Sequence, residues 1–380
     1  MKNIVFIGVL LYGIFIQGNL ILQGQDYKNF EISLLTADPG KELFTSWGHS
    51  AIRVRDAVSG YDAVFNYGMF DFHAPNFYSN FAQGRLNYYL GAYDFDSFLA
   101  SYAYENRKIK EQVFELDSVQ KQFVINFLIN NVQPENRYYL YHFFLDNCAT
   151  RIRDLMILTY DGLVFPEEKA NFTYRELIYL YLGNHPWGRF GIDIALGLPT
   201  DQKTNMYEQM FLPDYLFDAF AEAKYNGKPI VKTTQDIFIP DRPAVQPPGF
   251  FTPMLVCCLI LGLSVLFCFI KKGARLFDFS LFFVVGLIGL LVVFLWFFTD
   301  HTNTINNLNI IWALPTHLIM AFFLLTKKPG IFVQKYFLAT AMIAVLLLAG
   351  WVFLPQKLNS AMIPLTMAIA LRAYWNSRKK

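Results

Sequence analysis

The sequence predicts an exported α+β domain that is followed by an all-α bundle of membrane-spanning helices. Of its 380 residues, 54% are hydrophobic, and this apolar excess is concentrated at the N-terminus and after Phe250. Between these regions, segments with strand periodicity are interspersed with segments of helical periodicity, which is typical of one α+β domain. The formal net charge is +2, and residues 26–240 carry no basic stripe. Nucleic acid is therefore not an expected partner.

The first segment, residues 1–25, reads "MKNIVFIGVLLYGIFIQGNLILQGQ". One lysine, a long apolar run and a small polar end predict a secretory signal peptide with an indistinct cleavage site. An uncleaved N-terminal anchor is the alternative. Either segment would export the residues after it, which we expect to form a soluble domain over 26–240 and a Pro-rich linker over 241–253.

Within the soluble domain, alternation of apolar and polar residues predicts strands, and apolar residues at helical spacing predict helices. Asp117 and Gln120 have the spacing of a capping box at the start of one helix. The strands are expected over 30–38, 50–56, 63–68, 86–93, 109–116 and 137–144, with a last pair of short strands at 228–232 and 236–240. The helices are expected over 117–132, 147–160, 173–183 and 205–223.

After the linker, residues 254–376 have the character of a transmembrane domain of about five helices. Each apolar stretch is close to the length of about 20 residues that crosses a bilayer. The basic segments 271–275, 327–328 and 372–380 fall on one side if the stretches alternate in direction, and the positive-inside rule makes that side cytoplasmic. The apolar stretches are 251–270, 279–298, 309–326, 336–354 and 360–376. Pro355 and Pro364 interrupt the last two, so a re-entrant pair is the alternative to two full spans there.

Cys148, in "DNCATRIRD", is the only cysteine of residues 26–240. It has no disulfide partner there, so in an oxidising compartment it is either a packing residue or a reactive thiol. A helix that starts at Asn147 or Cys148 would place the thiol at the positive end of the helix dipole, which favours thiolate. Arg151 and Arg153 would add positive charge. We expect the remaining cysteines to be packing residues of the first membrane stretch: Cys257, Cys258 and Cys268.

A nucleophilic cysteine requires a base, and His49 is the best candidate because it lies where a Gly-bearing turn enters a strand. His142 lies within an aromatic strand and is expected to be a core residue, whereas His73 and His185 precede prolines in loops. No HExxH, CxxC, GxSxG or glycine-rich phosphate loop is present, so neither a metal nor a cofactor is expected. The available chemistry is that of cysteine with histidine.

"GHSAIRV" followed about a hundred residues later by "DNCATRIRD" resembles the circularly permuted papain-like group, which includes NlpC/P60-like cell-wall peptidases and lecithin:retinol acyltransferase-like enzymes. The chain is most similar to the Lnb-type lipoprotein N-acyltransferases. Five further motifs carry this resemblance: "FNYGMFDF", "NFYSNFAQGRLNYYL", "WGRFGIDIALG", "FLPDYL" and "TDHTNTINNLNIIWALP". The resemblance implies a permuted papain-like periplasmic domain that precedes a transmembrane bundle in the bacterial inner membrane.

The resemblance implies that Cys148 is the nucleophile and that His49 is its base. Asn66 and Asp71 are alternative third, orienting residues, and each also has a simple structural reading, as a strand-end hydrogen bonder and a turn cap. Arg151 could stabilise charge. His301 and Asn309 would share the periplasmic side of the membrane with the cysteine domain and could position the substrate, although a polar loop joining two spans explains them equally well.

The implied reaction transfers an acyl chain from a membrane phospholipid, through a Cys148 thioester, to the N-terminal amine of a diacylglyceryl-cysteine lipoprotein. Membrane attachment is consistent with this reaction, because extracting lipid chains into water would cost about 0.8 kcal/mol per CH₂. Two alternatives remain: a membrane-tethered cysteine peptidase or amidase that acts on cell-wall peptide, and an envelope scaffold in which Cys148 is a packing residue.

Overall fold

The computed structural model describes residues 27–166, 171–241, 249–326 and 330–378. The described residues form two compact units. Of these residues, the sheet unit contains 27–81, 85–166, 171 and 204–241, and the helix unit contains 82–84, 172–203, 249–326 and 330–378. Residues 172–203 thus pack with the helix unit although they precede the expected linker. The expected signal segment 1–25, most of the linker and the basic pair 327–328 lie outside the described residues.

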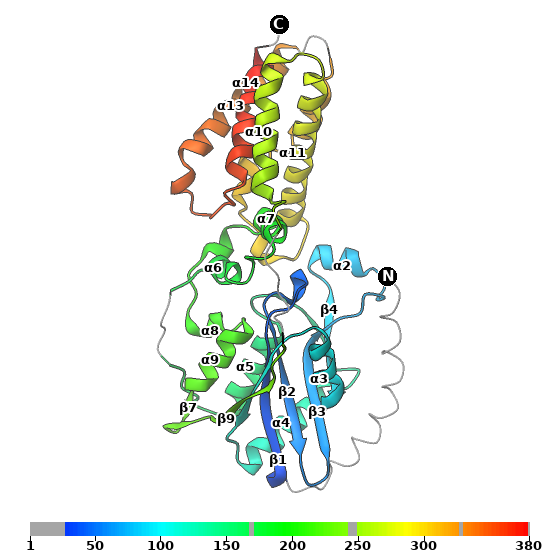
Figure 1. The fold of residues 1–380 in the computed structure, drawn as a ribbon, viewed down its shortest axis with the longest axis vertical. Helices are drawn as coiled ribbons and strands as arrows, with labels where there is room; N and C mark the ends of the chain where they lie inside the picture. Colours follow the sequence, from blue (N-terminus) through cyan, green and yellow to red (C-terminus); the bar gives the residue numbers. More distant parts are fainter. Residues whose placement is uncertain (1–26, 167–170, 242–248, 327–329, 379–380) are drawn as a thin grey trace. The chain divides into compact units, whose positions relative to one another are not determined.

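The sheet unit is built on an antiparallel sheet with the strand order β6-β4-β3-β2-β1-β5-β9. Three of its strands, β1, β2 and β3, are seen side by side in Figure 1. The two strands that carry the predicted base and one candidate orienting residue are neighbours, with Ile52 paired to Phe65. The strands are β1 Phe30–Ala37, β2 His49–Asp56, β3 Tyr61–Met69, β4 Asn87–Asp94, β5 Ile109–Phe114, β6 Tyr138–Leu140 and β9 Val231–Phe238, with a separate hairpin of β7 Lys224–Tyr225 and β8 Lys228–Pro229.

Both faces of this sheet are covered by helices, since alternate strand residues are buried against different neighbours. Ile52 and Phe65 belong to the main core, which also contains Ile152 of α5 and Leu216 of α9. Ala51 belongs to a smaller core on α3. The helices are α2 Phe77–Gln83, α3 Phe95–Tyr104, α4 Ser118–Asn131, α5 Cys148–Thr159, α8 Met206–Gln209 and α9 Pro213–Glu222. The sequence did not predict α2 or α3.

Most expected elements of the sheet unit are present, and the capping box of Asp117 and Gln120 is confirmed. The strand expected over 137–144 is shorter than predicted, because Nδ1 of His142 accepts the N–H groups of Phe144 and Leu145 and turns the chain. His142 is thus a turn residue.

Two further expectations near the end of the sheet unit were wrong in detail. The helix expected over 205–223 is two helices, because Asn205 caps the first and Pro213, which has no N–H, begins the second. The expected pair of short strands is instead one long edge strand, β9, that comes after the β7–β8 hairpin.

The helix unit contains two short helices before the linker and an apolar helical part after it. α11 and α13 are long and apolar enough to cross a membrane, and α10 is a shorter apolar helix. The helices are α6 Tyr174–Tyr179, α7 Pro186–Ala195, α10 Pro253–Phe269, α11 Ala274–Phe297, α12 His317–Phe323, α13 Ile331–Ala349 and α14 Met362–Ser377. The 3₁₀ helices of the two units are Tyr27–Asn29, Leu43–Thr45, Leu198–Asp201, Thr302–Thr304, Leu308–Ile311 and Trp351–Phe353.

The apolar stretch 309–326 departs from the prediction, since its α-helix, α12, covers only His317–Phe323. The backbone of this stretch, before α12 and at its first turn, packs directly onto two glycines of α11. A Cβ on Gly289 would lie 2.0 Å from the carbonyl oxygen of Ala313, and one on Gly286 would lie 2.2 Å from the nitrogen of Leu318. Hydropathy cannot detect such close packing, because it depends on composition alone.

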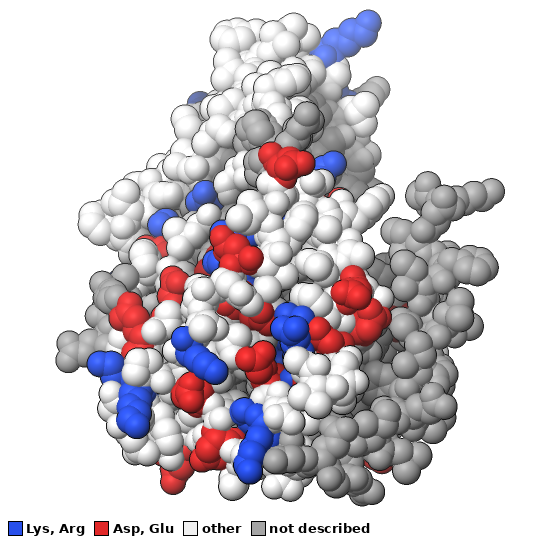
Figure 2. Space-filling view, turned by 60° about the horizontal axis from the view of Figure 1, so that its bottom comes forward, with Lys and Arg blue, Asp and Glu red and all other residues white. Residues whose placement is uncertain are grey.

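The surface differs in character between the two units. Figure 2 shows acidic and basic side chains intermixed over the sheet unit, whereas the side chains of the helical bundle in view are mostly uncharged. Inside the helix unit, Arg372 of α14 donates hydrogen bonds of 2.6 and 2.9 Å to Asp278 of α11. Neither side chain is exposed. This ion pair joins α14 to the apolar helix α11.

We expect Asp278→Asn to destabilise the full-length protein by about 3–5 kcal/mol, because the charge of Arg372 would stay buried without its partner. Thermal unfolding in detergent, followed by tryptophan fluorescence, measures this effect. The paired replacement of Asp278 by Leu and Arg372 by Met is the control and should cost much less, since it removes both charges. Equal destabilisation by the single and paired replacements would contradict this account of the ion pair.

Candidate active site

Cys148 is the first residue of α5, and Asn147 caps this helix. The Oδ1 atom of Asn147 accepts the N–H groups of Ala149 and Thr150, both at 2.9 Å. The N–H of Asn147 donates to Oγ1 of Thr150 at 2.8 Å, which completes a capping box. The N–H of Cys148 is therefore the donor of the first turn that the cap does not use.

The other end of the Asn147 amide fixes the helix start to two neighbouring segments. Its Nδ2 atom donates to the carbonyl oxygens of Phe143 and Phe211, both at 2.8 Å. Asn147 is only 3% exposed, so these contacts are shielded from water. The sequence indicated the helix start, but the two long-range acceptors depend on tertiary packing and carry no sequence signal.

His49 is the first residue of β2, and its ring stacks on Tyr102 of α3 with centroids 6.4 Å apart. Its Nε2 atom lies 2.5 Å from Oδ1 of Asn66, a buried residue of the neighbouring strand β3. Because an amide oxygen only accepts hydrogen bonds, Nε2 carries the proton in this arrangement. Nδ1 is then the ring nitrogen that can accept the thiol proton of Cys148.

The thiol of Cys148 and the imidazole of His49 interact by charge and by a hydrogen bond. Burial opposes ionisation of Cys148, but the attraction and hydrogen bond of His49, together with the N–H groups of Ser50 and Ala149, lower the pKa of the thiol. Burial likewise opposes protonation of His49, but the Cys148 charge and the hydrogen bonds with Cys148 and Asn66 raise its pKa. Both shifts favour the thiolate–imidazolium pair.

Gly68 is a further residue of this site that was not singled out in the sequence. Its φ is +87°, and a Cβ built on it would lie 3.7 Å from the Cβ of Cys148 and 3.9 Å from Cε1 of His49. The left-handed conformation, more than the space, explains the glycine, because an L side chain is strained there. Its only sequence signal is its place near the end of a predicted strand.

Two other predicted site residues occupy defined positions near this site. Asp71 lies in the turn after β3, where its Oδ1 accepts the N–H of His73 at 2.8 Å. The structure thus brings Asn66 rather than Asp71 to His49. Arg151 forms a two-pronged ion pair with Asp146 at 2.6 and 2.8 Å and stacks on the ring of Tyr139 at 3.7 Å.

The remaining two predicted residues belong to the helix unit. His301 lies against Gly84, whose Cβ would be 3.1 Å from Nδ1 of the histidine. Asn309 is fully buried and donates to the carbonyl oxygen of Asp193 at 2.7 Å, while its Oδ1 accepts the indole N–H of Trp312 at 2.9 Å. These contacts give Asn309 a structural role in the fold. Contact of either residue with substrate remains a prediction.

Comparison with known families identifies both parts of the chain. Residues 19–178 match the Lnb N-terminal periplasmic domain, and residues 245–380 match the Lnb transmembrane domain. The chain belongs to the Lnb-type lipoprotein N-acyltransferase family. No curated protein and no solved structure matches it.

Membership of the Lnb family makes this chain a membrane protein with a periplasmic domain. The pair of His49 and Cys148 lies within the part that matches the periplasmic domain. The permuted papain-like topology remains a prediction, although histidine at a strand start and cysteine at a later helix start are both observed. Among the described residues, no group of three or more His, Cys, Asp or Glu side chains could hold a metal ion.

The two pKa shifts predict how Cys148 reacts with an uncharged alkylating reagent. In the wild-type protein, the alkylation rate should fall only when the pH drops below the ordinary thiol range around 8.5, since the lowered pKa keeps the thiolate present. In His49→Ala the alkylation rate should fall already at higher pH. Burial then raises the pKa of the Cys148 thiol, and the imidazolium charge that opposes this effect is gone.

The measurement is iodoacetamide labelling of the full-length protein as a function of pH, with mass spectrometry of the peptide that contains Cys148. Restricting the readout to this peptide excludes the three cysteines of α10. A pH profile that is identical in the wild-type protein and in His49→Ala would show that the imidazole does not activate the thiol.

Proposed function

We propose that the periplasmic domain is a cysteine-dependent acyltransferase that N-acylates lipoproteins in two steps. The observation that carries this proposal is the chain of contacts from Asn66 through His49 to Cys148, at a helix start, in a member of the Lnb family. Cys148 is the nucleophile, His49 is the acid and base, and Asn66 orients His49. Asp71 is not needed for this arrangement.

In the first step, the Cys148 thiolate attacks an ester carbonyl of a membrane phospholipid. The N–H of Cys148, which the Asn147 cap does not use, can donate to the developing oxyanion. The carbon–oxygen ester bond breaks, the lysophospholipid oxygen takes the proton of the His49 imidazolium, and a thioester remains on Cys148.

In the second step, the free α-amine of a diacylglyceryl-cysteine lipoprotein attacks the thioester. Neutral His49 takes the amine proton, and the thiolate leaves as the amide forms. The enzyme returns to the thiolate–imidazolium pair, which the two pKa shifts favour. The net reaction converts one ester and one amine into one alcohol and one amide.

We further propose that the protein is a multi-pass protein of the bacterial inner membrane, with domain boundaries at 26–240, 241–253 and 254–376. The basic ends at 271–275 and 372–380 would lie in the cytoplasm. Arg151 is held by Asp146 and would contribute positive charge near the helix start. His301 and Asn309 would act from the transmembrane domain.

Replacing Cys148 by Ala should abolish N-acylation, because no thioester can form. The measurement is mass spectrometry of the N-terminal peptide of a lipoprotein in a strain whose only N-acyltransferase is this chain. The exposed Cys258, replaced by Ala, is the matched control and should retain activity. Full acylation in the Cys148→Ala strain would refute the mechanism, and altered cell-wall peptide in that strain would favour the peptidase alternative.

Asn66→Ala should lower kcat by at least about tenfold, because His49 loses the partner that fixes its proton on Nε2. Asp71→Ala should change kcat less than about twofold, since Asp71 holds only its own turn. Both variants can be compared in a purified acyl-transfer assay with a diacylated lipopeptide acceptor. A larger loss in Asp71→Ala than in Asn66→Ala would assign the orienting role to Asp71.

A further inference from the structure

The helix unit contains a pocket of about 160 Å³ whose walls come from three separate segments. Pro186 and Arg189 of α7 form one wall, residues 252–254 at the start of α10 form the second, and residues 359–361 before α14 form the third. This pocket lies outside the part of the chain that matches the periplasmic domain. The Asn66, His49 and Cys148 arrangement does not include any of its residues.

Arg189 is the cationic residue of the pocket lining, and its side chain is 40% exposed. Its guanidinium lies 3.7 Å above the ring of Tyr179. Its Nε atom is buried without a hydrogen-bond partner, and it lies 3.9 Å from Oδ2 of Asp193, beyond hydrogen-bond distance. The guanidinium is thus held in place by the Tyr179 ring, while its two terminal nitrogens, which form no hydrogen bond with described residues, remain available to a ligand.

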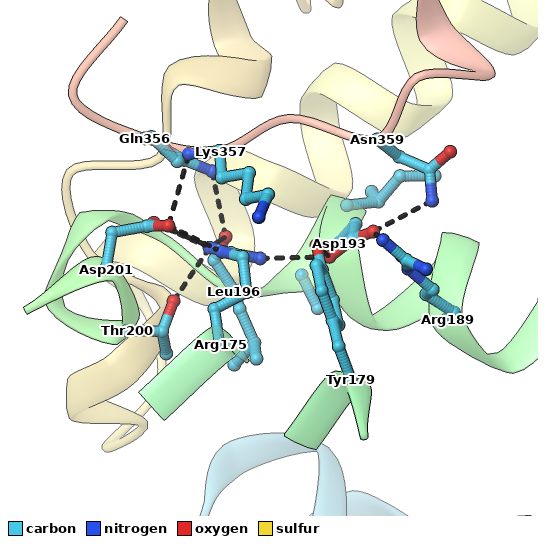
Figure 3. A network of polar contacts seen from close by, with 12 residues as sticks. Arg175, Tyr179, Arg189, Asp193, Leu196, Thr200, Asp201, Gln356, Lys357 and Asn359 are labelled. Carbon is cyan, nitrogen blue, oxygen red and sulfur yellow. Dashed lines mark hydrogen bonds and ion pairs between the residues drawn. The ribbon is translucent and has the colours of Figure 1, made fainter. Parts of the chain in front are cut away.

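The neighbouring carboxylate already has closer partners (Figure 3). Asp193 accepts hydrogen bonds from Arg175 at 3.0 Å, from the hydroxyl of Tyr179 at 2.5 Å and from Asn359 at 2.8 Å. Arg175 is fully buried, and its guanidinium pairs with both Asp193 and Asp201. Arg189 is a more distant cation beside Asp193, at 3.9 Å, and forms no hydrogen bond with this carboxylate.

The other polar groups of the pocket include neutral donors. Pro253 has no N–H, and Oγ1 of Thr252 accepts the N–H of Leu255 at 3.3 Å, so the N–H of Met254 is the first-turn donor that this cap does not use. Ser360, which also lines the pocket, is exposed, and its hydroxyl is a second neutral donor. A cation with donors around it fits a small anion such as a phosphate.

In the proposed topology, the pocket would lie at the depth of lipid headgroups. α10 is the first helix after the linker that follows the periplasmic domain, so its first turn would lie at the outer membrane–water boundary. Trp187 is 41% exposed. It donates its indole N–H to the carbonyl oxygen of Phe251 at 2.9 Å, and its ring stacks on the ring of Phe251. Phe250 is 89% exposed. Exposed aromatic residues of this kind are typical of the interfacial region.

We propose that this pocket binds the phosphodiester group of an outer-leaflet phospholipid, with Arg189 as the main contact. The acyl chains would lie along the exposed apolar side chains of α10, among them Leu259 and Leu263. This inference deepens the proposed function and rests on it for one point only, that such a lipid belongs to the class of the acyl donor. A free phosphate would use the same donors but would not contact the exposed apolar side chains farther along α10.

The test is a native mass spectrometry titration of the full-length Cys148→Ala protein in detergent, in which the lipid cannot be consumed. The probes are phosphatidylglycerol, a diacylglycerol with the same chains, and inorganic phosphate. We expect phosphatidylglycerol to bind more tightly than the other two. Arg189→Gln should raise its apparent Kd about tenfold, as expected for the loss of a charge-assisted contact.

Two variants make the result specific. Arg275→Gln removes an exposed arginine at the start of α11 and should leave the apparent Kd within about twofold of the parent value, whereas Arg189→Lys should lose less affinity than Arg189→Gln because it keeps the charge. Equal losses from Arg189→Gln and Arg275→Gln would indicate diffuse charge attraction and overturn the proposal.

Unchanged affinity in Arg189→Gln would overturn the proposal as well. Arg189-dependent binding of inorganic phosphate without binding of phosphatidylglycerol would show that the lipid source is wrong. Because no turnover is measured, the titration and the lipoprotein acylation assay fail independently. A Cys148→Ala strain that still acylates lipoproteins would refute the acyl-transfer mechanism and leave the lipid site standing.

Discussion

The candidate active site depends on the amide side chain of Asn147. Its oxygen closes the first turn of α5, and its nitrogen holds that turn against the carbonyl groups of Phe143 and Phe211. A polar side chain that is almost fully buried must satisfy each of its groups, and here every contact also fixes the helix end that carries Cys148. The hydrogen bonds that the buried Asn147 amide requires therefore help to fix the position of the Cys148 thiol relative to His49.

A similar constraint applies in the helix unit, where amide side chains supply hydrogen bonds to backbone groups that lie outside regular helices or at their ends. Asn307 and Asn309 bind backbone carbonyls at the end of α7, and Gln356 accepts the N–H of Leu308 at 2.7 Å. Backbone groups that leave a helix near an apolar environment need such partners. The amides thus allow an irregular chain to lie against the glycines of α11.

The sequence predicted the classes of the main elements, because hydrophobic periodicity, caps and charge distribution are local signals. It also singled out Cys148 and His49, which the structure places in contact. It could not choose between Asn66 and Asp71, since the choice depends on the pairing of β2 with β3 and on the turn after β3. α3 was not predicted although Asp94 caps it. Hydropathy also gave 309–326 as one span, because it registers composition and not the approach of another backbone.

The course of the chain between the two units has a consequence for how the protein can be divided. The chain leaves the sheet unit at Asn171, contributes residues 172–203 to the helix unit, and returns at Thr204 to form α8, α9 and the edge strand β9. Within 172–203 lie Arg175 and Asp193, whose partners include Asn359, far along the sequence. A recombinant fragment that ends at the linker would contain the whole sheet, but residues 172–203 would lack their partners from the helix unit. A soluble version of the catalytic domain would therefore have to replace residues 172–203 with a short loop.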